Sequence, residues 1–169
     1  METNRTRRGF LQAAAAAGII GTATTTVSAR GGTGRPISGS GDARITNLEV
    51  FPVREVGGNT FEDRILEGES LSGPLDGTFK QTVSGKVDES GRVVFRGRIE
   101  FTGSLADCGE GVLNLGVTGR GEVPEPGFPI TESSVRVINQ SANTIDVTGT
   151  GSLSQLGPDL TYEIRYNCR

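Results

Sequence analysis

Three carboxylates near residue 65 are the first side chains whose spacing could do chemistry. Asp63, Glu67 and Glu69 share the strand phase of Phe61 and Ile65, and alternate residues of a β-strand point to the same face. A carboxylate enclosed by a sheet has a raised pKa and can act as a general acid or base, and carboxylates at this spacing could also hold calcium. A bulge or an early strand end would instead place them in water. Glu67 and Glu69 are therefore candidate ligand-binding residues, and we expect no resident metal.

Tyr162 and Tyr166 are the second candidate pair, on one face of a predicted strand over residues 160–168. If this face points inward, the two hydroxyls could orient a ligand in a cavity. The alternative is that both are core tyrosines whose hydroxyls bond to backbone groups.

The cysteines are the remaining candidates for covalent chemistry. Cys108 lies in a predicted loop over residues 105–110, and Cys168 lies on the inward phase of the last strand. A single pair of cysteines in an exported chain usually forms a disulfide, so we predict a Cys108–Cys168 bond; two unpaired thiols are the alternative.

Residue types that are missing narrow the function further. The chain has no His, no Trp and only two Cys, which excludes Ser-His-Asp and Cys-His catalysis and zinc sites that need imidazole. Two cysteines alone cannot ligate an iron–sulfur cluster. No catalytic set can be identified, and we expect no cofactor.

Residues 1–29 have the features of an export signal. Arg7 and Arg8 stand in a segment that looks like the twin-arginine motif, an uncharged stretch covers 10–27, and a small-residue cleavage site ends at Ala29. A retained anchor is the alternative, but the stretch is mildly apolar, whereas a spanning helix needs about 20 strongly apolar residues. We predict cleavage after Ala29, secretion by the twin-arginine pathway, and no stable membrane insertion afterwards.

The charge balance indicates which partners to expect. Removing residues 1–29 takes away one acidic and three basic side chains, leaving 19 acidic and 14 basic ones in 140 residues. This acidic balance argues against nucleic acid, which requires a basic patch, and against an anionic membrane surface. Together with the export signal, it suits a protein from a halophilic archaeon.

Two further segments complete the domain organisation. Residues 30–42 contain five glycines and no apolar pattern, as in a flexible linker, so the folded domain is expected to span 43–169. Asn139 begins the sequence Asn-Gln-Ser in a predicted loop and is a candidate glycosylation site.

Alternation with period two dominates the domain. In residues 76–88, the odd positions are mostly apolar or Gly and the even positions are all polar, which predicts a strand with one wet face. Residues 88–91 predict a tight turn into a second such strand over 92–104. Further strands are predicted at 113–118, 145–153 and 160–168, with weaker ones at 44–54, 60–72 and 130–139.

About eight strands in sequence order predict an all-β antiparallel meander. Such a meander can remove its edges by closing into a small barrel, as lipocalins do. Glycines on the core-facing side, such as Gly97 and Gly103, would permit the sharp coiling that closure needs. A β-sandwich is the alternative.

Two glycine-marked segments carry a family resemblance. Residues 72–79, Ser-Gly-Pro-Leu-Asp-Gly-Thr-Phe, and the closing hairpin around 149–166 resemble those of a family of small uncharacterised exported microbial β-barrel proteins. That family is similar in fold to allene oxide cyclase and more distantly to dirigent proteins. The resemblance implies an eight-stranded barrel with an apolar cavity, and it transfers no catalytic residue.

These observations favour a non-enzymatic exported barrel that binds a small apolar ligand or serves at the cell surface. The alternative is an isomerase or cyclase resembling allene oxide cyclase, since a shaped cavity with one carboxylate can direct a reactive substrate without His. A tightly filled interior would count against both ligand hypotheses.

Overall fold

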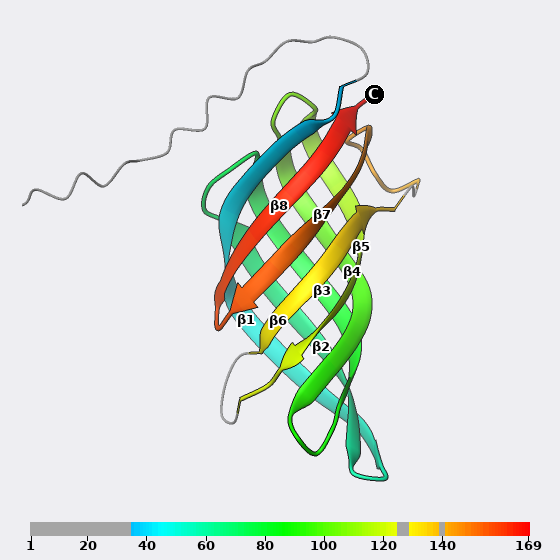
Figure 1. Cartoon of the computed structure of the whole chain (residues 1–169). Helices are drawn as coiled ribbons and strands as arrows, with labels where there is room; N and C mark the ends of the chain where they lie inside the picture. Colours follow the sequence, from blue (N-terminus) through cyan, green and yellow to red (C-terminus); the bar gives the residue numbers. More distant parts are fainter. Residues whose placement is uncertain (1–34, 125–128, 139–140) are drawn as a thin grey trace, which may run out of the picture.

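Eight antiparallel strands make up the fold (Figure 1). The computed structural model describes residues 35–124, 129–138 and 141–169. The strands are β1 (Ile37–Val56), β2 (Asn59–Ser70), β3 (Leu75–Val87), β4 (Arg92–Leu105), β5 (Gly109–Glu122), β6 (Ile130–Val137), β7 (Val147–Leu156) and β8 (Asp159–Cys168). Each strand pairs with the next, and β1 pairs with β8, so the strands form a closed ring. The predicted all-β meander of eight strands is confirmed.

Alternation along the strands separates the inside of the ring from its outside. In β3, Gln81 and Val83 are buried, whereas Lys80 and Thr82 are exposed, as period two requires. The buried apolar side chains of all strands meet inside the ring and form the core. They are Ala43, Ile45, Leu66, Val83, Val93, Ile99, Phe101, Leu105, Leu113, Val117, Val135, Ile145, Val147, Leu160, Tyr162 and Tyr166.

Inward glycines make room for aromatic rings on neighbouring strands. Gly68 pairs with Phe79, and a Cβ at Gly68 would lie 2.4 Å from the Phe79 ring. Gly119 pairs with Phe95, and a Cβ there would lie equally close to the Phe95 ring. Each aromatic side chain covers the glycine opposite it. The interior is filled in this way without any increase in the diameter of the closed sheet.

The expected linker over 30–42 is wrong in its second half, because 37–42 belong to β1. This segment pairs with β8 from Ile37, opposite Tyr166, onward. Gly41 fits there because a side chain would collide with Tyr162, whose hydroxyl lies 2.5 Å from a Cβ built at Gly41. Gly41 therefore allows close packing against Tyr162 of β8, and the folded domain begins at Ile37 rather than residue 43.

A disulfide closes the fold near the C-terminus. Cys108 follows β4, Cys168 ends β8, and the two form a bond with their Cα atoms 5.1 Å apart, as the sequence predicted. Both sulfurs pack beside the core cluster that contains Phe101 and Tyr166. Arg7, Arg8, Ala29 and Asn139 lie outside the described residues.

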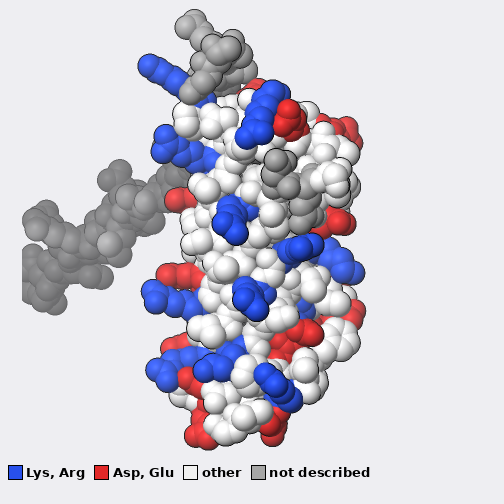
Figure 2. All heavy atoms as spheres, turned by 90° about the vertical axis from the view of Figure 1, so that its right-hand side faces the viewer, with Lys and Arg blue, Asp and Glu red and all other residues white. Residues whose placement is uncertain are grey.

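The outer surface carries both signs of charge. Figure 2 shows Lys and Arg spread over one face, with Asp and Glu among them and toward its margins. The described residues contain no helix of a length and hydropathy that would cross a membrane.

Candidate functional site

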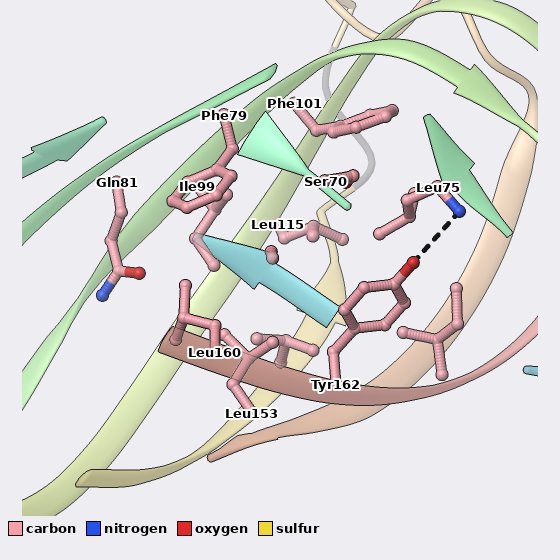
Figure 3. Close-up of a pocket in the computed structure, with 13 residues that line it drawn as sticks. Ser70, Leu75, Phe79, Gln81, Ile99, Phe101, Leu115, Leu153, Leu160 and Tyr162 are labelled. Carbon is pink, nitrogen blue, oxygen red and sulfur yellow. Dashed lines mark hydrogen bonds between the residues drawn. The ribbon is translucent and has the colours of Figure 1, made fainter. Parts of the chain in front are cut away.

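Tyr162 and Tyr166 point inward, and their hydroxyls bind backbone groups. The Tyr162 hydroxyl donates to the Ser72 carbonyl at 2.7 Å. It also accepts from the Leu75 N–H at 3.2 Å, the bond drawn in Figure 3. The Tyr166 hydroxyl donates to the Ala106 carbonyl at 3.2 Å. Burial raises the pKa of both tyrosines. The hydroxyls therefore hold the β2–β3 and β4–β5 connections against β8, which matches the structural alternative for these residues.

The ring of Tyr162 lines an apolar cavity inside the strands (Figure 3). Its volume is about 50 Å³, which is far below the roughly 300 Å³ of a typical ligand pocket but several times what one water needs. Most of the lining is aliphatic or aromatic, with Phe79 and Leu160 on opposite sides. The Gln81 amide lies at one end of this cavity, on a side chain that is 7% exposed.

A buried ion pair lies on the other side of Gln81. Arg64 donates through Nε and Nη2 to Oε1 of Glu62, and each side chain is only 9% exposed. The two residues are two positions apart on β2 and therefore share its inner face. With Gln81, they line a second cavity of about 20 Å³. Taking both charges out of water is costly, so this pair is a feature that core stability alone does not explain.

Two more polar side chains complete the lining of the second cavity. Thr131 on β6 donates to the Gln155 side-chain oxygen at 3.5 Å, and the Gln155 amide donates to the Gly157 carbonyl at 3.0 Å. Both residues are buried. The interior is thus apolar around Tyr162 and polar around Arg64, and Gln81 lies at the boundary between these parts.

Glu67 and Glu69 lie on the outer face of β2, so the prediction that they face a ligand cavity is wrong. Glu67 is 43% exposed and pairs with Lys80, whose Nζ lies 2.9 Å from Oε1. The hydrogen bond from Lys80 lowers the pKa of Glu67. The pairing of Arg64 with Val83 on β3 sets this phase, because residues directly opposite in neighbouring strands share a face.

Sequence reasoning missed Glu62 and Arg64 because Phe61 and Ile65 gave the opposite phase for this strand. Both apolar residues lie on the outer face, where Arg54 stacks 4.6 Å from the centre of the Phe61 ring. Gln81 could have indicated a polar region inside the sheet, because it is a polar residue on the inward phase of an otherwise apolar strand face.

The described residues contain no group of three or more His, Cys, Asp or Glu side chains that could hold a metal ion. The only buried carboxylate among them, Glu62, has Arg64 as its partner. The interior can therefore offer hydrogen bonds to a ligand, from a neutral ion pair and the Gln81 amide.

Two solved structures are similar to this chain, and the first of them supports the fold. A protein of unknown function from the DUF3224 family of Shewanella oneidensis has a similar structure, with a TM-score of 0.59 and 15% sequence identity over 79% of this chain and 98% of that one. A conserved protein of unknown function from Rhodopseudomonas palustris aligns over 79% of this chain and 99% of that one, with a TM-score of 0.47 and 14% identity. No family model matches the sequence, and no curated protein matches it.

Proposed function

We propose that this chain is an exported, non-enzymatic β-barrel protein of the allene oxide cyclase-like type that binds a small uncharged molecule inside the barrel. The observation that carries the proposal is the position of Gln81, between an apolar cavity and the buried Glu62–Arg64 pair. Cavities that combine apolar walls with a few convergent polar groups are the usual form of a small-molecule site.

The ion pair supports an uncharged ligand rather than an anionic one. Glu62 already neutralises Arg64, so a second carboxylate in this space would be an unpaired buried charge, which is strongly unfavourable. A hydroxyl, carbonyl or amide could instead exchange hydrogen bonds with Gln81 and extend its apolar part toward Tyr162.

The cavity volumes support a small ligand. About 50 Å³ and 20 Å³ suit a molecule of a few heavy atoms, such as a short-chain alcohol or ketone, whose affinity is expected to be only about millimolar. The isomerase alternative has less support, because Glu67 and Glu69 lie outside the ring and Glu62 is bound to Arg64.

Export remains part of the proposal because it rests on Arg7, Arg8 and the cleavage site at Ala29. A role at the cell surface would be compatible with the same signal and would use the outer face of the barrel instead of its interior.

Titration of the full chain with 1-butanol, followed by NMR, tests the interior site. We expect saturable shifts of the Gln81 side-chain amide and of residues around both cavities. Gln81→Leu should abolish them, because it removes the amide and fills the space, whereas Thr82→Leu, on the exposed face one position away, should leave them intact. Shifts that stay linear with concentration, or equal binding by the Gln81→Leu variant, would refute the interior site.

A further inference from the structure

The second half of β1 has a neighbouring strand on one side only. β1 pairs with β8 from Ile37 to Arg44 and with β2 from Ala43 to Val56. From Asn47 onward, the described residues provide backbone partners on the β2 side alone. In Figure 1 this part of β1 continues with β2 into a hairpin that projects beyond the lower end of the ring. We call residues 47–56 the free edge.

Apolar side chains are concentrated along the free edge. Eight large apolar side chains are exposed among the described residues, and half of them lie within these ten positions. They are Val50 (44% exposed), Phe51 (46%), Val53 (61%) and Val56 (56%). An unpaired strand edge with exposed apolar side chains is a template for a further strand.

The free edge is complementary to itself when it is read in the opposite direction. With Phe51 placed opposite Phe51 of a second copy, Val50 lies opposite Pro52. The pairing of β1 with β2 has a register shift between Pro52 and Arg54, in which Val53 is the extra residue. With that bulge kept in the pair of copies, the next outer-face residue opposite Glu49 is Arg54. Each Glu49 therefore meets an Arg54, twice across the pair.

The faces of these two residues agree with that pairing. Glu49 pairs with Ile65 and Arg54 with Phe61 on β2, and Phe61 and Ile65 both alternate with the buried inner-face residues of that strand. Glu49 and Arg54 consequently lie on the same outer face, although five positions separate them. Residues directly opposite in an antiparallel pair share a face, so the two charges can meet.

We propose that two copies of this chain associate through the free edge as antiparallel strands about a twofold axis at Phe51. The Glu49–Arg54 complementarity favours a second copy over an unrelated peptide, which would have to supply matching charges. A twofold contact uses the same surface on both partners and closes at two copies. Pro52 lacks an N–H and so removes one donor from the ladder, which leaves Phe51 and the charges to select the register. This inference does not depend on what occupies the interior.

Sedimentation velocity of the purified full chain at increasing concentration tests the proposal. We expect a monomer–dimer equilibrium. Glu49→Arg or Arg54→Glu alone should weaken it by at least about tenfold, because each places like charges opposite one another twice. The double variant, Glu49→Arg with Arg54→Glu, should restore the dimer, since it exchanges the two partners. Glu163→Arg makes the same charge change on β8, which is paired on both sides, and should dimerise like the unaltered chain.

The double variant separates the proposed register from general effects on folding, because Arg54→Glu also removes the contact with Phe61. Two results would overturn the proposal: a chain that stays monomeric up to about 1 mM, the weak end of measured affinities, or a double variant that dimerises no better than the single variants. A monomeric chain that binds an extended peptide from another protein at this edge would also overturn it.

Discussion

Val83 and Thr82 are neighbours on β3 whose side chains leave opposite faces of the sheet. Val83 is buried at 4% exposure, and Thr82 is exposed. Val83→Asp should destabilise the fold by at least about 3 kcal/mol, because the new carboxylate would lie opposite Arg64, which Glu62 already neutralises, and would be a buried charge without a partner of its own. Thr82→Asp should cost less than about 0.5 kcal/mol. Urea unfolding of both variants would measure the difference, and equal losses would contradict the one-sided burial of β3.

Glu62 and Arg64 show a different consequence of position at the residue scale. Removing one partner of a buried pair leaves the other charge uncompensated, whereas replacing both with apolar residues is often tolerated. The fold therefore does not depend on these charges as a source of stability, and the proposed ligand site would give their position beside Gln81 a role.

The turn between β3 and β4 is the element in which a single carboxylate organises most of the local hydrogen bonds. Asp88 accepts bonds from the hydroxyl and N–H of Ser90 at 2.6 and 2.9 Å and from the N–H of Arg92 at 3.1 Å. It also pairs with the Arg92 guanidinium at 2.9 Å. Gly91 closes the turn with φ +79°, a left-handed conformation that glycine adopts at no steric cost.

These bonds predict how stability depends on pH. The hydroxyl bond from Ser90, together with the bonds from Arg92, holds the pKa of Asp88 well below its ordinary value of 3.8. A carboxyl group whose pKa is lower in the folded state than in the unfolded chain stabilises the fold at pH values above its unfolded pKa. This stabilisation is lost as the pH falls from the unfolded pKa to the folded pKa, because the group becomes protonated. We expect unfolding midpoints to decrease between about pH 5 and pH 2. Asp88→Asn should reduce that decrease, whereas Glu89→Gln, in the same turn, should retain it. An unchanged pH profile for Asp88→Asn would contradict the role of this carboxylate.

Closure of the whole molecule depends on contacts between distant parts of the chain. β1 and β8 meet along eight residue pairs, and the disulfide joins residues that are 60 positions apart. A cross-link of this span limits the unfolded chain and should contribute about 4 kcal/mol.

The disulfide can be tested by replacing both cysteines. Cys108→Ser with Cys168→Ser should lower the free energy of unfolding by about 4 kcal/mol, measured by urea denaturation at neutral pH. Dithiothreitol should lower the stability of the unaltered chain by a similar amount and leave that of the double variant unchanged. Free thiols in the denatured, unreduced protein would count against the bond.

The strands themselves could be predicted from the sequence, because alternation and turn residues are local properties. The strands expected at 76–88 and 92–104 match β3 and β4 to within one residue, since period two and the turn over 88–91 define both. The inward direction of Tyr162 and Tyr166 followed from the same periodicity, and the disulfide from the small number of cysteines in a chain with an export signal.

Only the tertiary structure decided which face of β2 is the inner one. Phe61 and Ile65 are apolar on one face, and Leu66 and Gly68 are compatible with burial on the other, so local composition did not decide which face of the strand points inward. The pairing of β2 with β3 decided it and put Glu62 and Arg64 inside. The start of β1 likewise depended on a distant partner, because Gly39 and Gly41 have little tendency to form a strand until β8 pairs with them. The sequence therefore determined the strands and their order, whereas register between strands, a relation among distant residues, determined the site.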